Sequence, residues 1–199
     1  MTVKLDVEQI QTAVRQRYAE MARTAEGKCP YPTGKAGLQA LAYEMSCLQD
    51  LPEDVLATFC GVGNPFALGP IHAGEAVLDV GCGGGVDLIV AHRLVGASGR
   101  VCGIDLTPEM VLQARINLER AGVTNSEVRC ARAEAIPYAN DTFDVVISNG
   151  VLNLSPVKEQ SFRELYRVLK PGGRLQFADM VLQHDLPPEA VGNLAAWSD

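Results

Sequence analysis

The stretch VLDVGCGGGVD, residues 77–87, decides the fold that we expect for this chain. Its apolar first half is typical of a buried strand, and four of the five residues at 81–85 are glycines. Glycine adopts positive φ angles and lets the backbone approach a ligand closely. A tight turn alone needs fewer glycines, so the stretch predicts a strand, a ligand-binding turn and a helix that begins near residue 86.

The same alternation of strand and helix continues to residue 180. Strands are expected at 76–81, 100–106, 127–133, 143–149 and 173–180, and helices at 86–95, 107–121 and 156–169. This alternation indicates the α/β class, here a Rossmann-like doubly wound parallel sheet with helices on both faces. Ligands of such sheets bind outside the carboxyl ends of the strands, so the functional residues are expected there.

The residues before this region predict an N-terminal helical cap. Apolar residues three and four apart indicate an amphipathic helix at about 3–23. Shorter helices are expected at 38–46 and 52–59, the second of them capped by Asp50. We therefore divide the chain into a helical cap or lid, residues 1–70, and a cofactor-binding core, residues 71–199.

Bulk composition limits the possible partners. The 199 residues are 47% hydrophobic and carry a formal net charge of -7, so we expect a packed core and no nucleic-acid partner, because an acidic surface repels phosphates. No apolar run approaches the ~20 residues of a membrane span, and no signal peptide is visible. The six cysteines form no C-x-x-C pair, which predicts reduced thiols and a cytoplasmic location, with Cys82, Cys102 and Cys130 as small buried hydrophobes.

Two cofactor classes use a glycine-rich turn of this kind. The dinucleotide fingerprint G-x-G-x-x-G fails because Val86 stands at the third glycine position, and Asp79 would bring a carboxylate toward a diphosphate. The same carboxylate suits S-adenosylmethionine, whose sulfonium and ammonium groups are cations. Asp105, 24 residues after Gly81 at the end of the second strand, is placed to accept both ribose hydroxyls. Nicotinamide-dependent oxidoreduction is the alternative, and it conflicts with Val86 and Asp79.

Five motifs resemble those of the class I S-adenosylmethionine-dependent methyltransferases in order and spacing: VLDVGCGGG, GIDLTPEM, AEAIP, FDVVISN and VLKPGGRL. The resemblance covers about residues 60–180 and implies an enzyme in which the glycine turn holds the methionine end of the cofactor. It places adenine after the third strand, although Arg132 stands where many relatives have an acid. The implied cofactor-binding residues are Asp79, Gly81, Gly83, Gly85, Asp105, Leu106, Met110, Ala133, Glu134 and Asn149, with no metal ion.

Two longer segments, GVGNPFALGPIHAGEAVLDVGCGGGVD and VVISNGVLNLSPVKEQSFRELYRVLKPGG, are similar to arsenite methyltransferases. Trivalent arsenic is soft, so thiolates are its natural ligands. The resemblance implies thiolates at two positions that hold Val62 and Gly150 here, while Cys29 matches an N-terminal cysteine of that group and Cys60 stands two residues from an expected one. We therefore expect a small organic or other soft acceptor, with arsenite bound by non-standard thiols as the alternative.

Residues that face the acceptor are expected where the fourth strand ends, beside the transferable methyl group. Tyr18 is either helix core or a lid residue whose hydroxyl reaches the carboxylate of the cofactor. Cys29, Cys47 and Cys60 form either a thiol cluster in the cap or ordinary packing. The expected substrate-facing residues are Tyr18, Cys60, Asn149, Gly150 and Asn153.

The end of the sequence bears on the sheet. The resembled family finishes its sheet with two further strands, and this chain ends inside the helix that precedes them, so the C-terminal strands are expected to be missing. A protein partner or a second copy is then expected to cover the edge of the fifth strand. The leading hypothesis is an S-adenosylmethionine-dependent methyltransferase with a small-molecule acceptor, and the alternative is a cofactor-binding subunit that needs a partner for catalysis.

Overall fold

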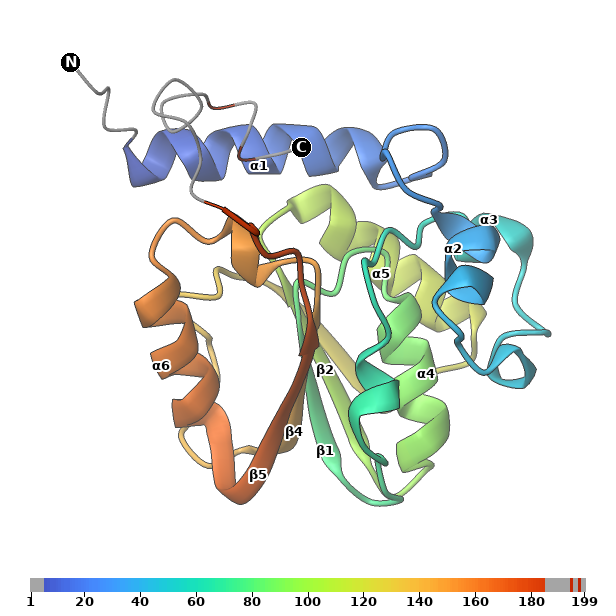
Figure 1. Ribbon diagram of the computed structural model, residues 1–199. Helices are drawn as coiled ribbons and strands as arrows, with labels where there is room; N and C mark the ends of the chain where they lie inside the picture. The colour runs from blue at the N-terminus through green and yellow to red at the C-terminus, as the bar shows by residue number, and fades with distance from the viewer. Residues whose placement is uncertain (1–5, 185–193, 195–196, 198–199) are drawn as a thin grey trace.

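The computed structural model describes residues 6–184, 194 and 197 of the chain, and a five-stranded parallel sheet lies at its centre (Figure 1). The strand order is β3-β2-β1-β4-β5, and every neighbouring pair is parallel. This confirms the predicted α/β fold. The strands are β1 Ala76–Val80, β2 Arg100–Asp105, β3 Ser126–Cys130, β4 Phe143–Asn149 and β5 Leu169–Ala178.

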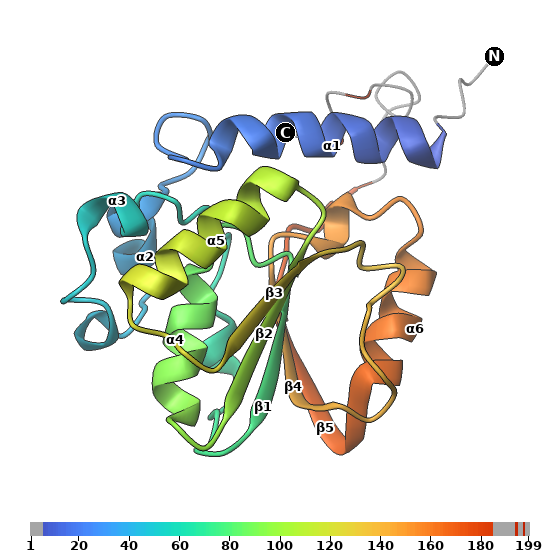
Figure 2. The same ribbon diagram turned by 180° about the vertical axis from the view of Figure 1, so that it is seen from behind.

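Helices cover both faces of the sheet, as the doubly wound prediction requires. The helices α4 (Val86–Val95) and α5 (Pro108–Arg120) lie on one face, and α6 (Lys158–Val168) lies on the other (Figures 1 and 2). Pro108 stands in the first turn of α5, where a backbone N–H would have no acceptor within the helix, so proline costs no hydrogen bond there. The strand order changes direction between β1 and β4, so the connections that follow these two strands run to opposite faces of the sheet. This leaves a crevice for a ligand at the carboxyl ends of the two strands.

The N-terminal part lies against the same body. The helix α1 (Val7–Met21) crosses the carboxyl end of the sheet, with its N-terminal half over the α6 side and its C-terminal half over α5 (Figures 1 and 2). Four short elements follow it on the side of α4 and α5. They are α2 Gly34–Ala40, η1 Met45–Cys47, α3 Glu53–Leu56 and η2 Pro65–Leu68. The division into a cap and a core at residue 70 stays a prediction.

Several predicted boundaries are wrong. The helix expected at 38–46 begins at Gly34 and ends at Ala40, and the one expected at 52–59 spans only Glu53–Leu56. Asp50 does not cap the latter, because Pro52 occupies the N-cap position and Asp50 pairs with Arg93 at 2.7 Å. The fifth strand begins early, at Leu169, since its pairing with Phe143 starts directly after α6 and shifts register before Arg174.

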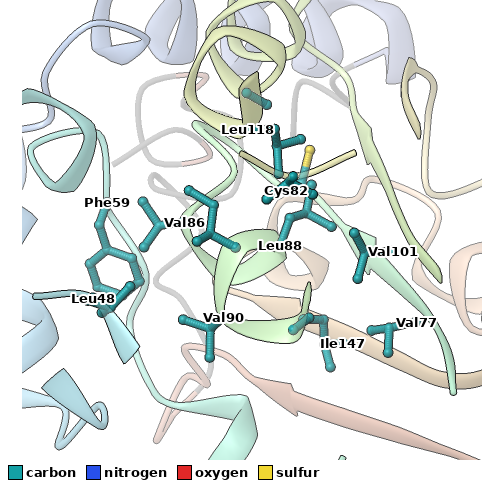
Figure 3. Close-up of a cluster of buried hydrophobic side chains, with 14 of the residues drawn as sticks. Leu48, Phe59, Val77, Cys82, Val86, Leu88, Val90, Val101, Leu118 and Ile147 are labelled. Atoms are coloured by element: carbon teal, nitrogen blue, oxygen red, sulfur yellow. The ribbon is translucent and has the colours of Figure 1, made fainter. Parts of the chain in front are cut away.

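Two apolar clusters, one on each face of the sheet, form most of the core. Successive strand residues point to opposite faces, so Val77 and Ile147 pack toward α4 while Leu78 and Val146 pack toward α6. Figure 3 shows Phe59 with the first of these clusters. The N-terminal part and the sheet therefore share one core.

The cysteines of the strands divide between the core and the surface. Cys82 and Cys102 are buried, as predicted. Cys130 is exposed, so that prediction is wrong, and the reason is its place as the last residue of an edge strand. None of the helices in the part of the chain that the structure describes is long and apolar enough to cross a membrane.

Asn117 joins α5 to the glycine turn, and its loss should weaken the fold. Its fully buried amide donates to the Gly84 carbonyl at 2.8 Å and lies 3.3 Å from the Thr58 hydroxyl. We expect Asn117→Leu to lower the free energy of unfolding by about 1–3 kcal/mol, because the buried Gly84 carbonyl loses its partner. Urea denaturation measures this, with the exposed Glu119→Gln on the same helix as the control. Equal midpoints for the two variants would contradict it.

Candidate functional site

An open cleft lies at the carboxyl ends of β1, β2, β3 and β4, beneath α1. It brings together ten of the predicted residues: Tyr18, Cys60, Gly81, Gly83, Asp105, Leu106, Ala133, Glu134, Asn149 and Gly150. Residues of the N-terminal part and residues at the ends of four strands thus line one cleft, as the sheet topology predicts.

The glycine turn shapes the floor of this cleft. Gly81 has a φ of 78°, and a Cβ there would overlap the Val151 side chain, so only glycine lets the turn approach the loop after β4. Gly83 has a φ of 50° and open space where its Cβ would stand. Gly85 is the left-handed N-cap of α4, and its Cβ would meet Ala114 at 3.2 Å. Gly81 and Gly83 therefore face the cleft, whereas Gly85 serves the packing of α4 on α5.

Asp105 holds the turn and the start of α5 together. Its carboxylate accepts the Gly83 N–H at 2.9 Å through Oδ2 and the Thr107 N–H at 2.8 Å through Oδ1. Burial raises the pKa of Asp105, and the two N–H groups oppose that shift. Each carboxylate oxygen can accept a further hydrogen bond, so both ribose hydroxyls of a nucleoside would find acceptors there.

A second, smaller cavity next to the turn contains two buried carboxylates, Asp79 and Asp87. No residue that the structure describes donates a hydrogen bond to Asp79, and burial raises its pKa well above the usual range, with Asp87 adding to the shift. Asp87 accepts from the Tyr43 hydroxyl at 2.8 Å. Burial raises the pKa of Asp87 to about 6, against the lowering effect of Tyr43 and Asn149. An unpaired buried carboxylate is costly, and a cationic ligand would relieve that cost.

Asn149 ties the N-terminal part to the end of β4. Its Oδ1 accepts the backbone N–H groups of Val62 at 2.8 Å and Gly63 at 3.1 Å. Its Nδ2 lies within hydrogen-bond distance of the Gly63 carbonyl, the Tyr43 hydroxyl and Asp87. The amide that we predicted to contact the cofactor is thus fully engaged by the protein itself, and its contact with the cofactor stays a prediction.

Gly150, which follows β4, lies next to Val62, which precedes β1. Gly150 has a φ of 72°, and a Cβ at this position would lie 3.2 Å from Val62 Cγ1 and 3.8 Å from Val62 Cβ. A Cβ separation near 3.8 Å is typical of paired cysteines. The two positions at which the resemblance implies thiolates therefore adjoin one another, and here they hold an isopropyl group and a hydrogen.

Tyr18 stands between the cleft and a thiol pair. Cys29 and Cys60 pack with Tyr18 against the cluster of Met21 and Met110, and Cys60 also lines the cleft. Burial raises the pKa of Cys60 to about 12, and the nearby Cys29 adds to the shift. Cys47 packs instead against the α4 side of the core, so a cluster of all three cysteines is excluded.

Three predicted residues besides Gly85 lie outside the cleft. Met110 is fully buried against Met21, Asp79 lines only the smaller cavity, and Asn153 donates its backbone N–H to Asp179 at 3.0 Å. Sequence reasoning missed several residues of the lining. They are Gln11, Val14, Ile104, Thr107, Ala131, Val151, Leu154, Ser155 and Pro156. Gln11 alone left a signal, as a polar residue on the helix face that also carries Val14 and Tyr18.

Comparison with known proteins agrees with this geometry. A protein-family model described as a methyltransferase domain matches residues 71–199. The crystal structure of a SAM-dependent methyltransferase from Aquifex aeolicus is 30% identical, with a TM-score of 0.55 over 63% of this chain and 70% of that one. This chain belongs to the S-adenosylmethionine-dependent methyltransferases. The class predicted from the glycine turn and Asp105 is confirmed, and so is the cofactor.

The predicted similarity to arsenite methyltransferases is also confirmed. An arsenite methyltransferase from Halobacterium salinarum is 35% identical over 203 residues, covering 95% of this chain and 52% of that protein. The crystal structure of an arsenic(III) S-adenosylmethionine methyltransferase from Chlamydomonas reinhardtii is 35% identical, with a TM-score of 0.62 over 81% of this chain and 53% of that one. The chain spans about half the length of the curated relatives it matches.

The raised pKa values of this methyltransferase's buried carboxylates predict how its ligand affinity depends on pH. Burial raises the pKa of both Asp79 and Asp87, to about 6 for Asp87, and a bound ammonium group favours their charged forms over protonation. We expect the affinity for S-adenosylhomocysteine to rise several-fold between about pH 5.5 and about pH 7.5, measured by titration calorimetry. Asp79→Asn should flatten this rise, and the exposed Asp141→Asn should leave it intact. An equally steep profile for Asp79→Asn would refute the assignment.

The stability of the free protein should depend on pH with the opposite sign. A carboxyl whose pKa is higher in the folded than in the unfolded protein stabilises the fold fully below its unfolded pKa of about 3.9. This contribution to the free energy of unfolding is lost as the pH rises through the pKa of the folded protein. For Asp87 that value is about 6. Thermal unfolding of the free protein across this window, beside Asp87→Asn, measures the contribution.

Proposed function

We propose that this chain transfers the methyl group of S-adenosylmethionine to a small-molecule acceptor that enters the cleft beside Gly150. The observation that carries the proposal is Asp79, a buried carboxylate without a hydrogen-bond donor among the described residues, next to the glycine turn. A ligand with a cationic end and a ribose fits this turn and the free lone pairs of Asp105.

Each wall of the cleft has a role in this reaction. Asp79 neutralises the cationic methionine end, Gly83 leaves room for the backbone to approach it, and Asp105 holds the ribose. When bound, S-adenosylmethionine supplies a methyl group on a positively charged sulfur, which becomes a neutral thioether as the lone pair of the acceptor takes the methyl. Tyr18 and the rest of α1 cover the cleft and limit the access of water.

A small, uncharged or soft acceptor suits the other end of the cleft. The residues after β4, namely Gly150, Val151, Leu154 and Pro156, present carbon-rich surface to the cleft. The formal net charge of the chain is -7, which argues against a nucleic-acid acceptor. Orientation and proximity then provide much of the rate acceleration, and an acceptor with an available lone pair needs no general base.

Asp105 provides the direct test. We expect Asp105→Ala to weaken the binding of S-adenosylhomocysteine at least about tenfold, or about 1.4 kcal/mol, because two ribose hydroxyls lose their acceptors. Titration calorimetry measures the affinity, and the exposed Asp54→Ala is the matched control. The substitution also removes the hydrogen bonds from Gly83 and Thr107. Thermal unfolding of the ligand-free variant measures how much this loss destabilises the fold. The proposal is abandoned if the wild type binds no S-adenosylhomocysteine.

Arsenite is the second candidate acceptor, and the thiol pair favours it. Cys29 and Cys60 pack against the same buried cluster as Tyr18, and Cys60 lines the cleft. Trivalent arsenic prefers such soft ligands. These two thiols would then hold arsenite in place of the thiolates that positions 62 and 150 lack.

Replacement of Cys60 separates this candidate from an organic acceptor. We expect arsenite-dependent formation of S-adenosylhomocysteine, if arsenite is the substrate, to fall at least about tenfold in Cys60→Ser, because one soft ligand is lost. The exposed Cys130→Ser is the control for thiol loss alone. Arsenite turnover that survives in Cys60→Ser would exclude the thiol pair as the site, and a screen of thiols and small phenols would then identify the acceptor.

A dependent subunit is the third candidate, and the outer edge of β5 favours it. No strand in the described part of the chain pairs with that edge, and the exposed Phe162, Phe177 and Val181 lie on or near it. A partner that covers this edge would complete the sheet. A methyl-transfer assay on the isolated chain distinguishes the cases, since turnover by the chain alone would rule out the dependent subunit.

A further inference from the structure

Gln11 occupies an unusual position on the lid helix. It lies on the inward face of α1 between the apolar Ile10 and Val14, and only 4% of its surface is exposed. It lines the same cleft as Ala133 and Ser155. A glutamine in such a place would ordinarily be replaced by an apolar residue unless its amide has a partner.

The amide of Gln11 has an unmet hydrogen-bonding group. Its Oε1 is buried and has no partner among the described residues. Leaving a buried acceptor unpaired destabilises the free protein. The cost persists in the free protein and would be removed by a ligand that donates a hydrogen bond.

No other group that lines the cleft, Arg132 and Tyr18 included, donates to Gln11 Oε1, and several of these groups bond to one another. The Ser155 hydroxyl lies 2.5 Å from Glu134 Oε1 and 2.9 Å from the Ser161 hydroxyl. The Thr107 N–H donates to Asp105, and the amide of Asn149 is engaged with Gly63 and Tyr43. The acceptor of Gln11 is therefore unmet in the free protein, and a ligand in the cleft is the available source of a donor.

The position of Gln11 along α1 indicates which part of the ligand it meets. Tyr18, at the Cys60 end of the cleft, is seven residues further on, which is about 10 Å along a helix. Gln11 lies in the N-terminal half of α1, over the α6 side of the sheet (Figures 1 and 2). The loop after β3, which includes Ala133, packs into the core on that same side. Gln11 and this loop thus line the cleft at the end away from Cys60.

We propose that Gln11 reads the adenine ring of the bound cofactor through its amide. The amide presents a donor beside an acceptor, and adenine presents a 6-amino donor beside ring-nitrogen acceptors, so the two edges complement each other in two parallel hydrogen bonds. The neutral amide also suits a neutral ring. This inference rests on the proposed function, since it requires that the cofactor occupy the cleft.

Two ligands and three proteins test the inference by calorimetry. The ligands are S-adenosylhomocysteine and its analogue with hydrogen in place of the 6-amino group. We expect Gln11→Met, which keeps the length of the side chain and removes its amide, to bind S-adenosylhomocysteine about tenfold more weakly than the wild type. The analogue lacks the amino donor but keeps the ring-nitrogen acceptor, so Gln11→Met should weaken its binding by only about threefold. Gln16→Met, exposed on the same helix, should match the wild type with both ligands.

The stability of the free variant is an independent measurement. Gln11→Met removes an unpaired polar group, so its thermal midpoint without ligand should equal or exceed that of the wild type. A lower midpoint would mean that the amide has a structural partner, and would overturn the inference. Equal losses of affinity for both ligands would overturn it as well, and so would no loss for either. A wild type that binds neither ligand would instead refute the proposed function on which the inference rests.

Discussion

The amide of Asn149 is the contact on which the site depends. It accepts two backbone N–H groups from the segment that includes Val62 and Gly63, and it reaches Tyr43 and Asp87 from the same position. One side chain thereby fixes a segment from before the sheet against the end of β4, across more than 80 residues of sequence. The wall that contains Cys60 and Val62 exists as part of the cleft because this amide holds it there.

Three carboxylates, those of Asp79, Asp87 and Asp105, crowd the region beside this contact. Burial raises the pKa of all three, and the charges of Asp87 and Asp105 raise the pKa of Asp79 further. Asp87 and Asp105 receive hydrogen bonds from the protein that offset part of the cost, whereas Asp79 receives none from the described residues. In the free protein, Asp79 therefore keeps a desolvation cost that no hydrogen bond from the described residues offsets. A cation bound there gains more binding free energy than it would at a carboxylate that is already paired. This is a physical reason for the site to select a sulfonium cofactor.

Local sequence patterns could predict the sheet, the glycine turn and Asp105, because each follows from periodicity or from the conformational freedom of glycine. The same patterns failed where tertiary contacts decide. The helices α2 and α3 end at Ala40 and Leu56, earlier than the local pattern predicts, and Cys130 is exposed because β3 is an edge strand. Asn149 was expected to serve the ligand, but its partners lie far away in the sequence. The contact of Gly150 with Val62 has the same origin, since no window of sequence includes both.

That contact sets the shape of the acceptor site. Gly150 takes a left-handed φ of 72°, which disfavours any side chain, and a Cβ there would press on Val62 at 3.2 Å. A larger residue at position 150 would thus need both backbone strain and movement of Val62, whose backbone Asn149 holds in place. The two positions have to change together if thiols are to occupy them, because each fills the space of the other. With Gly150 backed by Val62, this part of the lining is apolar, and the soft sulfur of Cys60 also belongs to the lining. The difference between an organic acceptor and a metalloid therefore depends on which part of the lining the acceptor contacts, the apolar residues Gly150 and Val151 or the thiol of Cys60.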